Sequence, residues 1–302
     1  MEAWMRTRIS LFGMIAAVLG VFLSGLLVTN PDEALSESAL TIEPSDWQFA
    51  GSLPLVDVPE PSGIAYCPGR DTLFVVDDGA KDRPSGLYEV QLIKVTHPEY
   101  GDVTDTKIVG KLELGKDLEG VCFNRTNGLL YVCDEAGERV YEVAPEGPKH
   151  LRTFRISAEY SGMQAFEQGG DGFEGIAFRP VSGLPLGGEF FLANQNDPTC
   201  VLKVVLPDKG GEVGKEPVLV KIQKIIDVEQ INLGDLLYDE ASGKLWLSHA
   251  WQNLLEIVDP DIGKSLRLEL LPGCAQEGIT IDADGRLWIA QDVGGLAVYE
   301  KA

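Results

Sequence analysis

The segment Leu118-Glu119-Gly120-Val121-Cys122-Phe123 opens an apolar stretch, and related segments occur at four other places in the chain. These are Pro61-Ser62-Gly63-Ile64-Ala65-Tyr66, Phe173-Glu174-Gly175-Ile176-Ala177-Phe178, Leu233-Gly234-Asp235-Leu236-Leu237-Tyr238 and Gln276-Glu277-Gly278-Ile279-Thr280-Ile281. They lie roughly 43 to 60 residues apart, which is within or near the spacing of blade-type repeats. The recurring Glu-Gly pairs indicate that each repeat opens in the same way.

Each opening segment is followed by a second and a third segment rich in β-branched and aromatic residues. Turn sequences such as Asn-Gly, Ser-Gly and Asp-Gly separate these segments, as expected for antiparallel strands. No part of residues 47–302 shows a convincing helical period. The glycine after each glutamate allows close backbone approach or a positive φ where the strand begins. The soluble part is therefore predicted to be all-β.

A fourth strand is expected before each later opening segment, at residues 107–114, 151–156, 218–226 and 265–270. The last repeat ends at Ala302 without one, whereas residues 47–55 have a strand pattern and no repeat of their own. If this N-terminal strand completes the final blade, the ring closes and exposed edges are avoided. We therefore predict a five-bladed β-propeller closed by residues from both ends. The alternatives are a β-sandwich or an open array of hairpins.

Residues 9–28 carry no charge and are long enough, at about 1.5 Å per helical residue, to cross a hydrocarbon core of about 30 Å. Arg6 and Arg8 precede this run and acidic residues follow it, so the N-terminus is expected to stay in the cytoplasm. A cleaved signal peptide is the alternative, but no Ala-x-Ala-like site follows the run. The predicted organisation is a cytoplasmic segment 1–8, a transmembrane signal-anchor 9–28, an acidic linker 29–46 and a propeller 47–302 outside the cell membrane, in the periplasm or extracytoplasmic space.

The chain is strongly acidic, with 47 acidic against 25 basic residues and a net charge of −22. Such a charge repels nucleic acid and attracts cations or basic partners, although solubility alone also explains it. We expect no nucleic-acid partner. Gly-x-Ser-x-Gly, phosphate-loop, dinucleotide-binding and His-Glu-x-x-His motifs are absent from the sequence.

The chain has five cysteines, so at least one is unpaired or pairs with another chain if the protein is exported. Asn127-Gly128 predicts a two-residue hairpin turn, which places Cys122 opposite Cys133. That position allows a disulfide, and buried unpaired cysteines are the alternative. No Cys-x-x-Cys or Cys/His cluster indicates zinc.

Polar residues end every second strand, in the pairs Asp77-Asp78, Asp134-Glu135, Asn194-Gln195, Ser248-His249 and Gln291-Asp292. In a propeller the inner strand begins and the second strand ends at the same face, so these residues should meet the opening glutamates at one channel mouth. Converging carboxylates repel one another unless they are protonated, hydrated or bridged by a cation. An all-oxygen ligand set suits calcium. The predicted metal ligands are Glu119, Glu174, Glu277, Asp78, Asp134 and Glu135; the alternative is that they cap strand ends in a water-filled channel.

The Glu-Gly units and the stretch Ser62-Gly63-Ile64-Ala65-Tyr66 resemble those of the SdiA-regulated family, and the similarity covers roughly residues 47–299. The resemblance implies a bacterial envelope protein with an N-terminal membrane segment and a five-bladed propeller distantly similar to NHL repeats. It also implies a calcium site, and no enzymatic activity is established for the family as a whole. The fourth unit departs from the pattern, because Gly234-Asp235 stands where Ser-Gly or Glu-Gly is expected.

We therefore expect a membrane-anchored extracytoplasmic propeller that binds a protein, peptide or glycan of unknown identity, with Ca²⁺ at its channel mouth. The alternative is a calcium-dependent hydrolase of the lactonase or phosphoesterase type that uses the same carboxylates. In that case His249 is the candidate general base, beside Asp134 or Asp292. A purely structural propeller with a stabilising ion is the third possibility.

Overall fold

The computed structural model describes residues 40–79, 83–97, 101–169 and 171–302 of the chain. The predicted membrane segment 9–28 lies outside these residues. Within the described part, no helix has the length and apolar composition that crossing a membrane requires.

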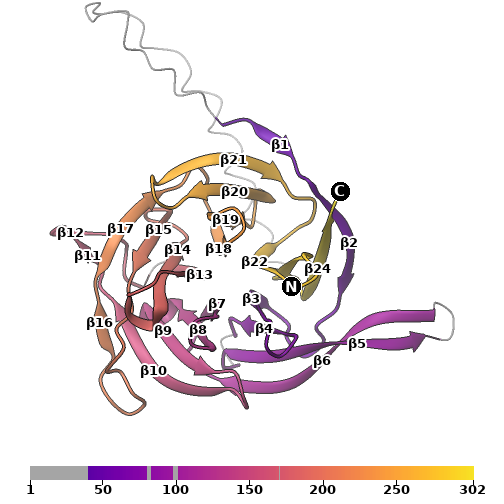
Figure 1. The fold of residues 1–302 in the computed structure, drawn as a ribbon, viewed down its shortest axis with the longest axis horizontal. Coiled ribbons are helices and arrows are strands. Elements are labelled where there is room, and N and C mark those ends of the chain that lie inside the picture. The colour runs from indigo at the N-terminus through magenta and orange to yellow at the C-terminus, as the bar shows by residue number, and fades with distance from the viewer. Residues whose placement is uncertain (1–39, 80–82, 98–100, 170) are drawn as a thin grey trace, which may run out of the picture. The chain divides into compact units, whose positions relative to one another are not determined.

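Four-stranded antiparallel sheets are repeated five times around a central channel (Figure 1). In each sheet the chain starts at the innermost strand and steps outward. Blade 1 contains β3 (Pro61–Cys67), β4 (Thr72–Asp77), β5 (Gly86–His97) and β6 (Gly101–Glu113). Blade 2 contains β7 (Leu118–Asn124), β8 (Leu129–Asp134), β9 (Arg139–Ala144) and β10 (Lys149–Ile156). Blade 3 contains β13 (Phe173–Pro180), β14 (Gly188–Asn194), β15 (Cys200–Val204) and β17 (Ile222–Asp227).

Blade 4 contains β18 (Leu233–Asp239), β19 (Lys244–His249), β20 (Leu254–Asp259) and β21 (Lys264–Leu270). Blade 5 contains β22 (Gln276–Ile281), β23 (Leu287–Gln291) and β24 (Gly295–Lys301), and its outer strand is β2 (Trp47–Leu53). β2 pairs antiparallel with β24, so that Trp47 lies opposite Lys301 and Leu53 opposite Leu296. Blade 5 thus combines strands from both ends of the described chain.

The five inner strands contact one another in a closed cycle, β3 to β7, β13, β18, β22 and back to β3. This cycle, together with the five sheets, confirms the predicted all-β, five-bladed propeller. The second strand of a blade is covered on both faces, and all six residues of β4 are buried. Continuous apolar runs rather than alternating patterns are expected for such strands, which is why these segments stand out in the sequence.

Two short strands extend the sheets at their outer edges. β1 (Ile42–Pro44) pairs parallel with β21, and β16 (Val218–Val220) pairs parallel with β10. The single strand predicted at residues 218–226 is therefore wrong, because its first part joins blade 2 and only Ile222–Asp227 belongs to blade 3. Covering an outer edge removes unpaired backbone groups that would otherwise template association. A small hairpin, β11 (Glu159–Tyr160) and β12 (Met163–Gln164), lies in the connection from blade 2 to blade 3.

The predicted strand register, with Cys122 opposite Cys133, is wrong. Asn124 lies opposite Leu129, so the turn contains residues 125–128 and Cys122 faces Tyr131. The longer turn is stabilised because the Asn124 side-chain oxygen accepts the backbone N–H of Thr126 at 2.9 Å. Both cysteines are free and buried, as expected for small apolar side chains.

Candidate functional site

The inner strands share one local irregularity at the channel mouth. In blade 2, Leu118 pairs with Asp134 and the next pair is Val121 with Val132, so Glu119 and Gly120 face a single residue. This is a β-bulge, which re-aims a side chain. The ladder shifts register at the same place in all five blades. The positions equivalent to Glu119-Gly120 are Ser62-Gly63, Glu174-Gly175, Gly234-Asp235 and Glu277-Gly278.

The glycines of these pairs lie where the backbones of neighbouring blades come closest. A Cβ atom on Gly120 would lie 2.5 Å from the Cα of Gly175, and one on Gly278 would lie 2.3 Å from the carbonyl oxygen of Ser62. No side chain fits at such distances, so glycine is required for close approach. Neither glycine has a positive φ. The glycine of the Glu-Gly pair is therefore required for close backbone approach and not for a positive φ.

The glutamate that precedes Gly120 belongs to a cluster of three carboxyl groups. One oxygen from each of Asp117, Glu119 and Glu135 lies within 4.8 Å of the other two. Ser62 of blade 1 donates a hydrogen bond to Glu119 at 2.6 Å, and the backbone N–H of Gly172 donates to Glu135. Residues from three blades therefore converge here. We call Asp117, Glu119 and Glu135 the axial acidic cluster.

Glu174 lies near enough to this cluster for Glu119 and Glu135 to repel its charge. Its side chain is 8% exposed and its carboxylate accepts no hydrogen bond from any residue that the structure describes. Burial raises its pKa well above the usual range, and repulsion from Glu119, Glu135 and Glu277 raises it further. Burial also raises the pKa of Glu119 well above its usual range and the pKa of Glu135 to about 7. The ionised forms of these groups are therefore costly unless a cation neutralises them.

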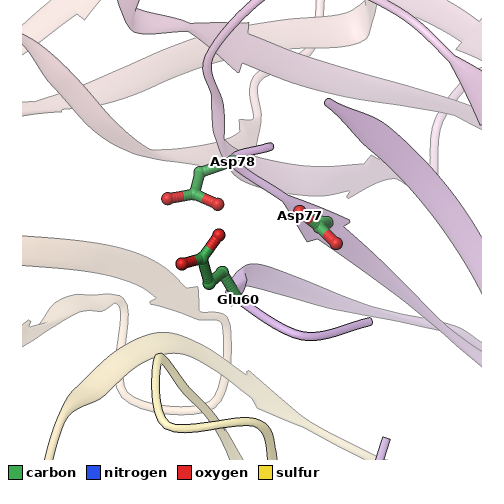
Figure 2. Close-up of side chains that lie close together, drawn as sticks. All are labelled: Glu60, Asp77 and Asp78. Atoms are coloured by element: carbon green, nitrogen blue, oxygen red, sulfur yellow. The ribbon is translucent and has the colours of Figure 1, made fainter. Parts of the chain in front are cut away.

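A second group of carboxyls lies at the same mouth in blade 1. Ligand atoms of Glu60, Asp77 and Asp78 lie within 4.8 Å of one another. Figure 2 shows that the carboxylates of Glu60 and Asp78 face each other while Asp77 lies to one side. Arg83 forms ion pairs with Asp77 and, at 3.0 Å, with Glu60. Since no described Lys or Arg pairs with the axial acidic cluster, that cluster is the better cation site.

The side chain of the last residue of each second strand forms a hydrogen bond with the backbone of a nearby loop. Asp134 is buried and accepts the N–H of Asp117 at 3.2 Å and the hydroxyl of Tyr141 at 2.7 Å. Asp77 accepts the N–H of Gly79 at 2.8 Å, and Asn194 donates to the carbonyl of Asn196. Asp134 therefore caps the end of its strand, as in the alternative interpretation, and is not a member of the axial acidic cluster.

His249 occupies the same position in blade 4. It is fully buried, its Nε2 lies 2.9 Å from Glu256 and its Nδ1 lies 3.1 Å from the carbonyl oxygen of Ile231. Both ring nitrogens are thus engaged inside the blade. Leu233 lies opposite His249, just as Leu118 lies opposite Asp134. The residues of blade 4 that correspond to Asp134-Glu135 are therefore His249-Ala250, and the predicted pair Ser248-His249 is wrong by one residue.

In blade 4 the glycine and the polar residue stand in the reverse order. Gly234 occupies the position of Ser or Glu in the other blades, and Asp235 occupies the position of their glycine. Asp235 stands at the glycine position, is 1% exposed, and its Oδ2 accepts the N–H of Ile279 at 3.0 Å. Its Oδ1 occupies the space where a Cβ on Gly175 would lie, 2.3 Å away. Burial raises its pKa well above the usual range. Asp235 therefore packs between the inner strands of blades 3 and 5, and blade 4 supplies no carboxylate from Gly234.

Sequence reasoning placed Glu119 and Glu135 together correctly but missed Asp117. Asp117 directly precedes the opening segment, and its two-residue spacing from Glu119 was a usable signal. Asp78 lies in the blade 1 group instead. Glu277 lies toward blade 4, where burial raises its pKa to about 7 and Asp292 adds repulsion.

These features define a five-bladed β-propeller whose channel mouth gathers buried carboxyl groups. The chain belongs to the SdiA-regulated family, whose model matches residues 60–293. No curated protein matches the sequence.

Among solved structures, the chain is similar to a glutaminyl cyclase from Myxococcus xanthus, at 13% identity and a TM-score of 0.56, over 84% of this chain and 95% of that one. It is also similar to a chain of a nidogen/laminin complex, at 13% identity and a TM-score of 0.47, over 77% and 73% of the two chains. A third similar structure is a Bacteroides caccae protein of unknown function, at 10% identity and a TM-score of 0.46, over 78% and 72%. At these identities the likeness concerns the fold alone.

Proposed function

We propose that this protein is a calcium-dependent binding propeller, held outside the cell membrane by residues 9–28, that recognises an extracytoplasmic ligand over its channel mouth. The observation that carries the proposal is the axial acidic cluster, whose three carboxyl groups lie within 4.8 Å of one another. Glu174, a buried residue whose carboxylate has no hydrogen-bond donor among the described residues, adds its repulsion to them. Buried charges are normally paired or bound to metal. A cation between Asp117, Glu119 and Glu135 would stabilise these three groups directly and would offset the repulsion that they exert on Glu174.

The donor set supports a hard cation. Asp117, Glu119 and Glu135 offer oxygen ligands only. Glu174 lies outside this set of three, but near enough for Glu119, Glu135 and Asp117 to raise its pKa by repulsion. Calcium accepts about six to eight oxygen ligands in flexible geometry, with water filling the remaining positions. When bound, it would neutralise the carboxylates and order the loops that carry Asp117 and Glu135. The anchor is supported by the uncharged run 9–28, which Arg6 and Arg8 precede and acidic residues follow.

Calcium is expected to raise the melting temperature of the full-length protein. If calcium is supplied at about 100 times its dissociation constant, binding to the folded state stabilises it by about 2.7 kcal/mol. For a domain of this size, that corresponds to an increase of about 5 to 10 °C. The measurement is thermal unfolding in excess Ca²⁺ and in chelator, with Mg²⁺ as the control because it prefers a smaller octahedral site. Equal melting temperatures with Ca²⁺ and with chelator would contradict the proposal.

A further inference from the structure

Blade 4 lacks both side chains that most other blades place at the mouth. Gly234 stands where blades 2, 3 and 5 carry glutamate, and Ala250 stands where the others carry Asp78, Glu135, Gln195 and Asp292. A cavity of about 320 Å³ is lined by Ala250, the second of these small residues. Its walls include Trp251, Asn253, Cys274, Glu277 and Asp292. We call it the blade 4–5 pocket.

The small size of Gly234 has a direct consequence for Glu277. A Cβ atom on Gly234 would lie 2.8 Å from Oε2 of Glu277. A glutamate here, as in the neighbouring blades, would force the Glu277 carboxylate to move from its position. The glycine therefore leaves room for Glu277 to lie at the pocket, away from the axial acidic cluster.

Three side chains of the pocket, Asn253, Glu277 and Asp292, carry acceptor oxygens to which no described residue donates a hydrogen bond. Oδ1 of Asn253 is buried and has no hydrogen-bond partner among the described residues. Within that same part of the chain, no residue donates a hydrogen bond to the carboxylates of Glu277 or Asp292, and the pocket walls contain no Lys, Arg or His. Trp251 is 83% exposed at the rim. An exposed indole beside two carboxylates is an arrangement that attracts organic cations.

We propose that the blade 4–5 pocket binds a primary ammonium group on an apolar body, held by Glu277, Asp292, Asn253 and Trp251. A primary ammonium has three N–H donors and no acceptor, which matches the three acceptor side chains. The apolar body would pack on the indole of Trp251, where the charge also gains a cation–π contact. This inference deepens the proposed binding function and rests on it, because it names the chemistry of the ligand at the same mouth.

The test uses calorimetric titration of the full-length protein, in Ca²⁺, with 2-phenylethylamine and with 2-phenylethanol. The two probes have similar size and differ in the ammonium group. The amine is expected to bind at least about tenfold more tightly. Trp251→Ala and Asp292→Asn should each weaken amine binding by about tenfold or more. Ile262→Ala, which shortens an exposed side chain on the β20–β21 turn at the opposite face, is the matched control and should change nothing.

Equal affinity for the amine and the alcohol, no binding of either, or unchanged amine affinity in Trp251→Ala would overturn the inference. Thermal unfolding of the same samples in Ca²⁺ and in chelator separates it from the calcium proposal. A calcium shift without amine binding rejects the pocket alone. Amine binding with these mutational losses but without a calcium shift supports the pocket and rejects the calcium site. Trp251→Ala should retain the calcium shift, because Trp251 lies outside the axial acidic cluster.

Discussion

Gly120→Ala is expected to lower the melting temperature of the full-length protein by about 6 to 12 °C. The new Cβ would lie 2.5 Å from the Cα of Gly175 and 2.7 Å from the backbone nitrogen of Ile176. Backbone atoms cannot rotate away as a flexible side chain can, so blades 2 and 3 must separate. Overpacking of this kind costs up to about 3 kcal/mol, and each kcal/mol corresponds to about 2 to 4 °C in a domain of this size.

Gly69→Ala is the matched control. A Cβ on Gly69 would meet no atom within 4 Å, and this glycine does not have a positive φ. Its stability should change by less than about 0.5 kcal/mol. The measurement is thermal unfolding of both variants and the wild type. If both variants unfold at the wild-type temperature, the inner strands are not in such close contact.

The double variant Glu119→Gln/Glu174→Gln is expected to lose the calcium-dependent increase in melting temperature. Both side chains are buried in the region of converging carboxyls, and their charges provide the attraction for the ion. The control replaces two exposed glutamates, Glu146→Gln/Glu300→Gln, and so changes the net charge equally. This control should keep the full calcium effect. Retention of that effect in the Glu119/Glu174 variant would place the ion elsewhere.

The Glu119→Gln/Glu174→Gln variant should also change how the free energy of unfolding depends on pH when a chelator removes calcium. Burial raises the pKa of Glu135 and Glu277 to about 7 and that of Glu119 and Glu174 well above 4.5. Between about pH 4.5 and 7 the folded state therefore holds more protons on these groups than the unfolded state does. Their contribution to the free energy of unfolding falls as the pH rises through this window. From about pH 5 to pH 8, the stability of the double variant should fall less than that of the wild type, as measured by thermal unfolding.

The architecture could be predicted because a propeller repeats its signals. Each second strand forms an apolar run, as in β4, and four of the five inner strands carry glycine at the same position near their start. The strand 218–226 was misread because parallel pairing to a neighbouring blade has no local signal. It depends on where β10 lies in space.

The site was predicted less completely, for physical reasons. The last residue of a second strand and the residue that follows it point in different directions. Asp134 therefore hydrogen-bonds to the loop at Asp117, while Glu135 belongs to the axial acidic cluster. The strand ends at Asp134 and Glu135 begins the short 3-10 helix Glu135–Gly137, so the alternation of the strand stops between them. The sequence does not reveal this change. The exchange of Gly234 and Asp235 was visible, but its effect depends on the contact between Asp235 and Gly175 in the next blade.

The most direct test of the calcium site is elemental analysis of the purified full-length protein, followed by calcium titration after chelation. We expect about one calcium ion per chain, retained on purification or taken up from about 1 mM Ca²⁺. The Glu119→Gln/Glu174→Gln variant, measured in parallel, should hold none. A wild-type protein that contains no calcium and takes up none from that solution would contradict the proposed site.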